Sequence, residues 1–232
     1  MSESGPREPF SRPHERAAHD STRLANLTIP GPAGPLEALL QDREGHEPAV
    51  AAVVCHPHPL YGGTMHNKVA HRVASTLFGL GAAVLRFNFR GVGKSAGTHD
   101  RGEGEKEDAR AALAWMRWRH PKARLWLAGF SFGSWIAARL SAETPEVERV
   151  ILVAPALKTS SFETMHHSRT PKLVIQGTDD TVCPPEMLRK DFPQWSDPKR
   201  LVWVEGATHF FDRKLAELGE ALTSALREER AV

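Results

Sequence analysis

Residues 123–140 read ARLWLAGFSFGSWIAARL, and this stretch decides the fold of the chain. Its first half is a short, nearly continuous apolar run, which is typical of a strand buried on both faces of a sheet. Its second half is typical of a helix. Between the two halves, Gly129-Phe130-Ser131-Phe132-Gly133 fits the pattern G-x-S-x-G. The stretch therefore predicts a strand, a sharp turn that carries a serine, and a helix.

The glycines on both sides of this serine have a physical reason. A serine raised above the end of a sheet on a sharp turn has a strained backbone, and its neighbours must lack bulk. The helix that begins just after the serine directs its free N–H groups at the reaction centre. The pattern alone occurs by chance, but its position between a strand and a helix predicts that Ser131 is a nucleophile.

Strands and helices alternate along the rest of the chain. Apolar runs predict strands at 22–31, 35–42, 49–55, 82–89, 123–130, 149–155, 172–177 and 200–206. Helices are expected at about 66–78, 106–119, 132–143, 184–192 and 212–229. The first two strands form a pair around a Gly/Pro turn. The alternation predicts the α/β class, with an open, mostly parallel sheet that has helices on both faces.

Composition and the chain ends limit the remaining possibilities. Residues 1–22 are polar and broken by prolines, so we expect a disordered leader before a single domain over 23–232. No uncharged apolar run reaches the roughly 18 residues of a membrane-spanning helix, and no signal peptide is evident. Two cysteines, Cys55 and Cys183, are expected to be free, which favours a reducing compartment and a cytoplasmic location. The net charge of +2 is too small to predict a nucleic acid or an anionic membrane as a partner.

A nucleophilic serine needs a base, and the base needs a carboxylate that orients it. With this kind of turn, the expected order along the chain is serine, acid, histidine. Asp179 and Asp180 directly follow the strand at 172–177, and His209 directly follows the strand at 200–206. These positions lie at the carboxyl ends of strands, where ligands bind in open α/β sheets.

These residues also support a resemblance to a known family. The chain resembles the α/β-hydrolase superfamily, and more narrowly its small bacterial serine hydrolases, over about residues 24–230. The resemblance rests on HPHPLYGGTMHNKV at 56–69, RFNFRGVGKSAG at 86–97 and GFSFGS at 129–134. It implies the α/β-hydrolase fold and a Ser-His-Asp triad, with neither a metal nor an organic cofactor.

The resemblance also implies which acid belongs to the triad. The family pattern after the acid-bearing strand is G-T-x-D-x-V-x-P, and it is matched by Gly177, Thr178, Asp180, Val182 and Pro184. Asp180 is therefore the expected acid, and Asp179 occupies a free position. The family's usual G-x-G-H around the base reads Gly-Ala-Thr-His at 206–209, so Thr208 departs from the pattern while His209 remains.

Catalysis by a serine also needs two N–H donors for the developing oxyanion. One is expected from the backbone of Phe132, just after the nucleophile. The other is expected from the loop at 56–63, whose two prolines have no N–H. The family's H-G-x loop aligns with the first three residues of this loop. This alignment points to the N–H of His58, with Leu60 as the alternative.

Other classes of function remain open at this stage. His56 and His58 form an H-x-H pair that could belong to a metal-dependent hydrolase, although no third ligand of suitable spacing is evident. Residues 91–95 end like a phosphate-binding loop and raise the possibility of a nucleotide-binding protein. The P-loop pattern requires a glycine at 88, where the chain has Asn88. A non-catalytic binding protein on a hydrolase scaffold is a third alternative.

Three acidic residues follow the glycine-rich loop, namely Asp100, Glu105 and Asp108. Asp and Glu are common at the start of helices, where their side chains bond to free N–H groups. We interpret the three as loop and N-cap groups of the next helix rather than as catalytic carboxylates.

The sequence thus predicts a serine hydrolase that cleaves small or short-chain carboxylic esters through an acyl-enzyme. Thioesters and peptide-like amides are alternative substrates for the same triad. Many relatives carry a cap between the strands that correspond to 149–155 and 172–177, but here only the 15 residues at 156–170 connect them. Without a cap, little apolar wall is available to bury a long acyl chain, at about 0.8 kcal/mol per methylene. We expect a small acyl substrate as the partner, and the chain could be a monomer or a homodimer.

Overall fold

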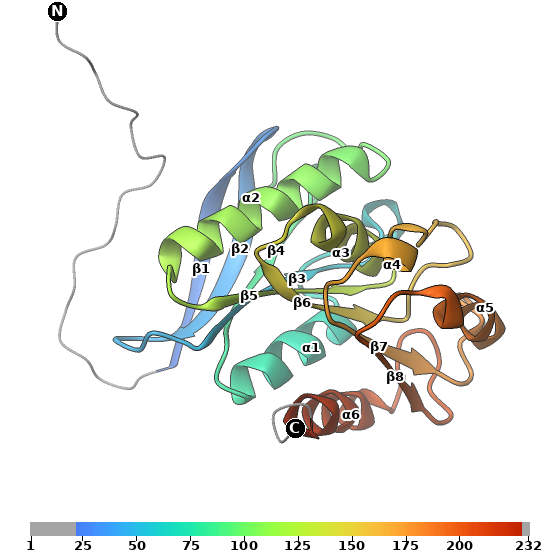
Figure 1. The fold of residues 1–232 in the computed structure, drawn as a ribbon. Coiled ribbons are helices and arrows are strands. Elements are labelled where there is room, and N and C mark those ends of the chain that lie inside the picture. The colour runs from blue at the N-terminus through green and yellow to red at the C-terminus, as the bar shows by residue number, and fades with distance from the viewer. Residues whose placement is uncertain (1–21, 229–232) are drawn as a thin grey trace, which may run out of the picture.

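The computed structural model describes residues 22–228 (Figure 1). The leader predicted at 1–22 lies outside the described residues except for Thr22, where the first strand begins. The strands are β1 Thr22–Gly31, β2 Gly34–Arg43, β3 Val50–Cys55, β4 Ala83–Phe87, β5 Arg124–Phe130, β6 Val147–Val153, β7 Lys172–Gly177 and β8 Lys199–Val204. The helices are α1 Lys68–Gly79, α2 Glu103–Arg119, α3 Phe132–Glu143, α4 Thr164–His167, α5 Pro185–Asp191 and α6 Leu215–Glu228, with 3₁₀ turns η1 Pro59–Tyr61 and η2 Phe192–Gln194.

The strands form one sheet in the order β1-β2-β4-β3-β5-β6-β7-β8. The neighbours from β4 through β3 to β8 are parallel, whereas β2 pairs antiparallel with both β1 and β4. The parallel part is built from helical crossovers, so its strands are covered on both faces. The predicted open, mostly parallel sheet is confirmed.

Helices cover both faces of this sheet, with α1 and α6 on one face and α2 and α3 on the other (Figure 1). The packing explains why β3 is a continuous apolar run. Ala51, Val53 and Cys55 belong to the core under α2 and α3. Val50, Ala52 and Val54, which alternate with them, belong to the core under α1 and α6. A strand between two cores needs apolar side chains at every position.

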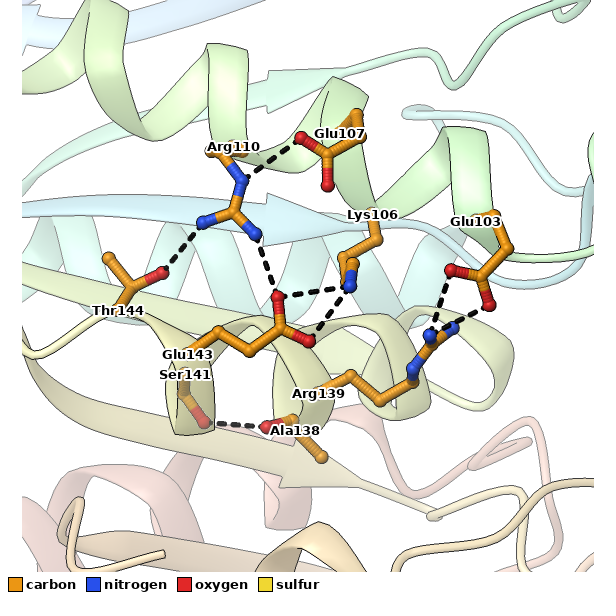
Figure 2. Close-up of polar contacts among 9 residues, drawn as sticks. All are labelled: Glu103, Lys106, Glu107, Arg110, Ala138, Arg139, Ser141, Glu143 and Thr144. Atoms are coloured by element: carbon orange, nitrogen blue, oxygen red, sulfur yellow. Dashed lines mark hydrogen bonds and ion pairs between the residues drawn. The ribbon is translucent and has the colours of Figure 1, made fainter.

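Charged side chains join α2 to α3 along their outer surface (Figure 2). Glu143 on α3 accepts hydrogen bonds from Lys106 and Arg110 of α2, both at 2.8 Å. Arg139 on α3 donates to Glu103 of α2 at 2.7 Å. A single exposed ion pair contributes little to stability, but connected pairs fix the relative position of two helices better than one.

The ends of two helices differ from the predicted ends. Helix α2 begins at Glu103, three residues earlier than predicted, because the carboxylate of Glu105 accepts the N–H of Gly102 and caps the first turn. Helix α6 begins at Leu215 rather than near 212, because Phe211 and Arg213 have positive φ angles of 52° and 59°. An L residue in that region cannot continue a right-handed helix.

The connection between β6 and β7 contains only α4, which is four residues long. A helical cap between these strands is therefore absent, as predicted. Ser131 follows β5, Asp180 follows β7 and His209 follows β8, so all three lie at the carboxyl edge of the sheet. Within residues 22–228, none of the helices combines the length and apolarity that crossing a membrane requires.

Candidate active site

Ser131 lies on the turn between β5 and α3, with φ 55° and ψ −119°. This strained conformation is rare for an L residue. A Cβ atom on Gly129 would lie 2.1 Å from the carbonyl oxygen of Gly133, and one on Gly133 would lie 2.4 Å from that of Cys55. Both glycines are therefore required by close backbone approach, which is the physical reason given for the pattern above.

The imidazole of His209 lies between the hydroxyl of Ser131 and the carboxylate of Asp180. His209 Nε2 is 3.0 Å from Ser131 Oγ, and His209 Nδ1 is 2.8 Å from Asp180 Oδ2. An ionised carboxylate can only accept, so Nδ1 carries the ring proton and Nε2 faces the serine as an acceptor. His209 is 4% exposed and Asp180 2%, so this contact is shielded from water. The structure brings together the three residues that the sequence predicted.

The carboxylate of Asp180 is held by three further hydrogen bonds. Its Oδ1 accepts the N–H groups of Val182 at 2.9 Å and Cys183 at 2.7 Å. Its Oδ2 accepts the side-chain amide of Gln176 at 3.0 Å, in addition to His209. Donors to the charged form stabilise a buried carboxylate. The two carboxylate oxygens thus bind different partners. These hydrogen bonds fix the plane of the carboxylate relative to the imidazole.

The adjacent Asp179 points elsewhere. It is exposed, and its Oδ1 accepts a hydrogen bond from the hydroxyl of Thr178 at 3.2 Å. Thr178 Oγ1 in turn accepts the N–H of Gly206 at 2.8 Å, which ties the loop after β7 to the loop after β8. The resemblance predicts Asp180 rather than Asp179 as the acid, and in the structure Asp180 is the aspartate that contacts His209.

The loop that carries His209 crosses directly over the end of β7. A Cβ atom on Gly177 would lie 2.2 Å from the carbonyl oxygen of Ala207. Thr208, which replaces the family's glycine, is exposed, and its hydroxyl lies 3.4 Å from a carboxylate oxygen of Asp212. Because the side chain of Thr208 extends into solvent, the departure from the pattern leaves the position of His209 intact.

The loop between β3 and η1 packs against the first turn of α3, through the contact of Gly133 with the backbone of Cys55 and His56. Phe132 is the first residue of α3, so its N–H has no partner inside the helix. The N–H of Leu60 already donates to Nδ1 of His58 at 3.2 Å. This hydrogen bond favours the backbone of His58 over that of Leu60 as a donor to a ligand.

His56 has no free nitrogen with which to bind a metal. Its Nδ1 donates to the carbonyl oxygen of Pro57 at 2.6 Å, and its Nε2 accepts the N–H of Phe89 at 3.0 Å. Burial lowers the pKa of His56 to about 4, so the ring is neutral at physiological pH. His56 is therefore a structural residue of this loop.

Among residues 22–228, one group of side chains has ligand atoms near enough for a metal, namely Asp180, Cys183 and His209, within 4.8 Å of one another. Burial, together with the Asp180 carboxylate, raises the pKa of the Cys183 thiol to about 12. A protonated thiol is a poor ligand and a poor nucleophile. The hydrogen bond between Asp180 and His209 matches the serine chemistry better than it matches a metal site.

The loop at 91–95 already binds a carboxylate of the chain itself. Glu37 Oε2 accepts the N–H of Lys94 at 2.9 Å and the side-chain amide of Asn88 at 2.8 Å. No helix follows this loop until Glu103, whereas a P-loop opens directly into one. The loop is thus occupied by Glu37, and its geometry does not fit the nucleotide-binding alternative.

A pocket of about 360 Å³ opens beside Ser131. Its walls include the loop of His58, the helix residue Trp135 and two basic side chains, Arg101 and Lys158. Apart from His58, these wall residues could not be predicted from the sequence. Their loops are distant in sequence, and no periodicity or motif signals that they meet.

A family model described as serine aminopeptidase, S33, matches residues 47–164, which is just over half of the chain. An uncharacterized protein of Rickettsia prowazekii is 35% identical over 212 residues, covering 88% of this chain and 89% of that protein.

Two solved structures are also similar. The first is an α/β serine hydrolase without lid from Xanthomonas campestris, at 40% identity and a TM-score of 0.83, covering 90% of this chain and 95% of that one. The second is an α/β serine hydrolase homologue from Coxiella burnetii, also at 40% identity, with a TM-score of 0.82 and coverage of 91% and 100%. Together with the turn at Ser131 and the sheet topology, these similarities establish that the chain belongs to the α/β serine hydrolases of the S33 serine aminopeptidase family, without a cap between β6 and β7.

Proposed function

We propose that this serine hydrolase cleaves small or short-chain carboxylic esters through a Ser131-His209-Asp180 triad and an acyl-enzyme. The observation that carries the proposal is the continuous contact from Ser131 Oγ through the His209 ring to Asp180, at the mouth of a pocket. Ser131 Oγ attacks the acyl carbon while His209 Nε2 takes its proton. Asp180 holds the imidazole tautomer and stabilises the imidazolium that forms.

The tetrahedral intermediate carries a negative charge on the former carbonyl oxygen. We assign the backbone N–H groups of Phe132 and His58 as its donors, because the first is unpaired in α3 and the second lies in the loop packed on that helix. His209 then returns its proton to the leaving alcohol. Water, deprotonated by the same histidine, attacks the acyl carbon and releases the acid and the free Ser131 hydroxyl.

The triad is tested by Ser131→Ala. Hydrolysis should fall by about three to six decades while the variant stays folded, and a fluorophosphonate should label wild-type Ser131 alone. Ser141→Ala makes the same change on α3, where the hydroxyl only donates to the carbonyl of Ala138 at 2.9 Å (Figure 2). This control should be labelled and active as wild type. Near-normal turnover in Ser131→Ala, or labelling at another residue, would exclude the proposed mechanism.

The preference for short acyl groups follows from the short connection between β6 and β7. Ala156, Lys158, Thr159 and Ser160 form one wall of the pocket, and the helix of this connection, α4, is only four residues long. In a series of p-nitrophenyl esters, kcat/KM should peak at short acyl chains, because additional methylenes remain in water. A steady rise in kcat/KM out to twelve carbons or beyond would contradict the proposal.

The family's description raises amide hydrolysis at a free amino terminus as a second candidate. An aminopeptidase has to bind a protonated α-amino group, which is cationic through most of the neutral range. The pocket beside Ser131 has Arg101 and Lys158 in its walls and no Asp or Glu among its lining residues in the described part of the chain. This charge pattern favours an ester substrate over an amino-terminal peptide. A panel of aminoacyl amides beside the esters distinguishes the two.

We also propose a cytoplasmic location and a small-molecule acyl substrate rather than a nucleic acid or a membrane. Cys55 and Cys183 are both free and buried, which supports a reducing environment. Cell fractionation with an antibody tests the location.

A further inference from the structure

The pocket beside Ser131 carries an unbalanced charge. Arg101 and Lys158 lie in its walls with the imidazoles of His58 and His99, and none of its lining residues within 22–228 is acidic. Low-dielectric walls around charges of one sign strengthen their attraction for a ligand of the opposite sign. The pocket is thus suited to a group with negative charge.

Arg101 is presented from a loop whose backbone is strained and fixed. Its φ is 50°, and the N–H groups on both sides of it, those of Asp100 and Gly102, donate to the carboxylate of Glu105 at 2.9 and 2.7 Å. Glu105 is fully buried. Strained residues persist only where their surroundings hold them, and they concentrate at functional sites.

Trp135 on α3 supports both loops that carry the basic residues. A Cβ atom on Gly102 would lie 2.3 Å from the indole ring, so the Arg101 loop rests directly on Trp135. The indole Nε1 donates to the carbonyl of Ser161 at 3.0 Å, which anchors the segment that contains Lys158. Ion pairs join α2, which follows the Arg101 loop, to α3, which carries Trp135 (Figure 2).

His99 completes this wall. Its Nδ1 lies 2.8 Å from Oε1 of Glu105, the same carboxylate that caps the Arg101 loop. The ring lies 5.0 Å from that of His58 and 6.0 Å from that of Phe132, the residues assigned above as oxyanion donors.

We infer that the substrate is an ester that bears a carboxylate, which Arg101 and Lys158 bind while Ser131 attacks the ester carbonyl. The inference rests on the proposed function, because it names the substrate class of the same site. A carboxylate can accept paired hydrogen bonds from a guanidinium, and a charged hydrogen bond is stronger than a neutral one.

Matched pairs of esters test this inference. Mono-4-nitrophenyl adipate and 4-nitrophenyl hexanoate differ in a carboxylate on the acyl side, and 3-carboxyphenyl acetate and phenyl acetate differ in one on the alcohol side. The measured quantity is the ratio of kcat/KM for the charged ester to that for the neutral ester. Comparing this ratio between wild type and the double variant Arg101→Gln, Lys158→Gln cancels the intrinsic reactivity of each ester.

In one of the two pairs, the ratio should fall by about ten- to a hundredfold in the double variant, and in wild type it should decline as salt is added. Arg213→Gln is the matched control, because Arg213 is also exposed at a positive φ of 59° but does not line the pocket. It should leave both ratios unchanged. The pair that responds shows which side of the ester carries the carboxylate.

A binding experiment separates failure of this inference from failure of the proposed function. By calorimetry, Ser131→Ala should bind mono-4-nitrophenyl adipate at least about tenfold more tightly than does the same protein with the two glutamines added. Equal ratios and equal binding, with hydrolysis still dependent on Ser131, would overturn the carboxylate inference and leave the triad standing. Hydrolysis that is independent of Ser131 would overturn the proposed function, and the calorimetric comparison would still decide the ligand class.

Discussion

Two buried histidines follow parallel strands at the same edge of the sheet, and their surroundings give them different roles. His56 follows β3 and is enclosed by backbone groups, the carbonyl of Pro57 and the N–H of Phe89. His209 follows β8, and its two nitrogens face Asp180 and Ser131. His56 and His209 are both buried, and both lie beyond the carboxyl end of a strand.

The difference teaches that the partners of the two ring nitrogens decide what a histidine can do. Burial disfavours the imidazolium of His56, and its Nε2 keeps a lone pair to accept the N–H of Phe89, so the ring remains neutral and joins the loop after β3 to the loop after β4. A carboxylate on one nitrogen and a hydroxyl on the other allow His209 to accept a proton and hold the resulting charge. His56 contributes to the site indirectly, because its loop carries His58.

The largest expected effect comes from replacing the two histidines in turn by glutamine. His209→Gln should lower kcat/KM by about three to six decades, since the proton acceptor for Ser131 is lost. Its unfolding free energy should change by about 1 kcal/mol or less. His56→Gln should retain far more activity and lose more stability. Ester hydrolysis and urea unfolding of both variants measure this, and the reverse pattern would exchange the roles assigned here.

The next largest effect is expected from a change that tests the role of the Asp180 carboxylate. In Asp180→Asn, the oxygen is expected to stay with the N–H groups of Val182 and Cys183, which leaves the amide nitrogen toward His209. The imidazole must then accept at Nδ1 and carry its proton on Nε2, facing Ser131. This is the wrong tautomer, and we expect a loss of about 10⁴ in kcat.

Asp179→Asn is the matched control for Asp180→Asn, because it makes the same change one residue away on an exposed side chain. It should cost less than tenfold in kcat. Circular dichroism checks that both variants fold, and kcat on one ester compares them. If Asp179→Asn lost activity while Asp180→Asn stayed active, Asp179 would be the acid, and the roles of Ser131 and His209 would be unchanged.

The smallest effect concerns stability and pH. Because the pKa of His56 is about 4 when folded and near 6.5 when unfolded, the unfolded chain binds this proton first as pH falls. Stability should therefore decline from about pH 6.5 toward 4. His56→Leu removes this proton and should reduce the slope of unfolding free energy against pH by at most about 1.4 kcal/mol per unit.

The same variant leaves the carbonyl of Pro57 and the N–H of Phe89 without their partner. Its stability at pH 7.5 should be lower than wild type by about 2–4 kcal/mol. His120, whose pKa burial also lowers to about 4, should still contribute its own share of the slope. Denaturant unfolding across pH 4.5–7.5 measures both quantities, and an unchanged slope in His56→Leu would show that His56 takes up its proton alike in both states.

Much of the fold could be predicted from the sequence, because its signals are local. The apolar runs of β3 and β5, and the two glycines around Ser131, follow from burial on both faces and from close backbone contact. The positions of His209 and the paired aspartates followed from the ends of their strands. Choosing Asp180 over Asp179 required the family pattern, since both residues follow the same strand.

The pocket wall could not be predicted in the same way. Arg101 and Lys158 are ordinary basic residues in loops, and only the packing of both loops on Trp135 brings them to one cavity. Glu105 was rightly predicted to be a cap, whereas the same prediction was wrong for Asp108, which lies inside α2 and accepts hydrogen bonds from Arg90. The contact of Glu105 with His99 depends on how the preceding loop folds back. Such contacts depend on tertiary packing between distant segments, which leaves no periodic or spacing signal in the chain.

The short connection between β6 and β7 has a consequence for how this scaffold can acquire new specificities. It forms a wall of the pocket, yet Ser131, Asp180 and His209 are all attached to other loops. Sequence added near Thr159, which is exposed, would extend over the pocket without passing through any of the triad's hydrogen bonds. A natural insertion or a graft at this position would therefore change the wall of the pocket while leaving the contacts among Ser131, Asp180 and His209 as they are.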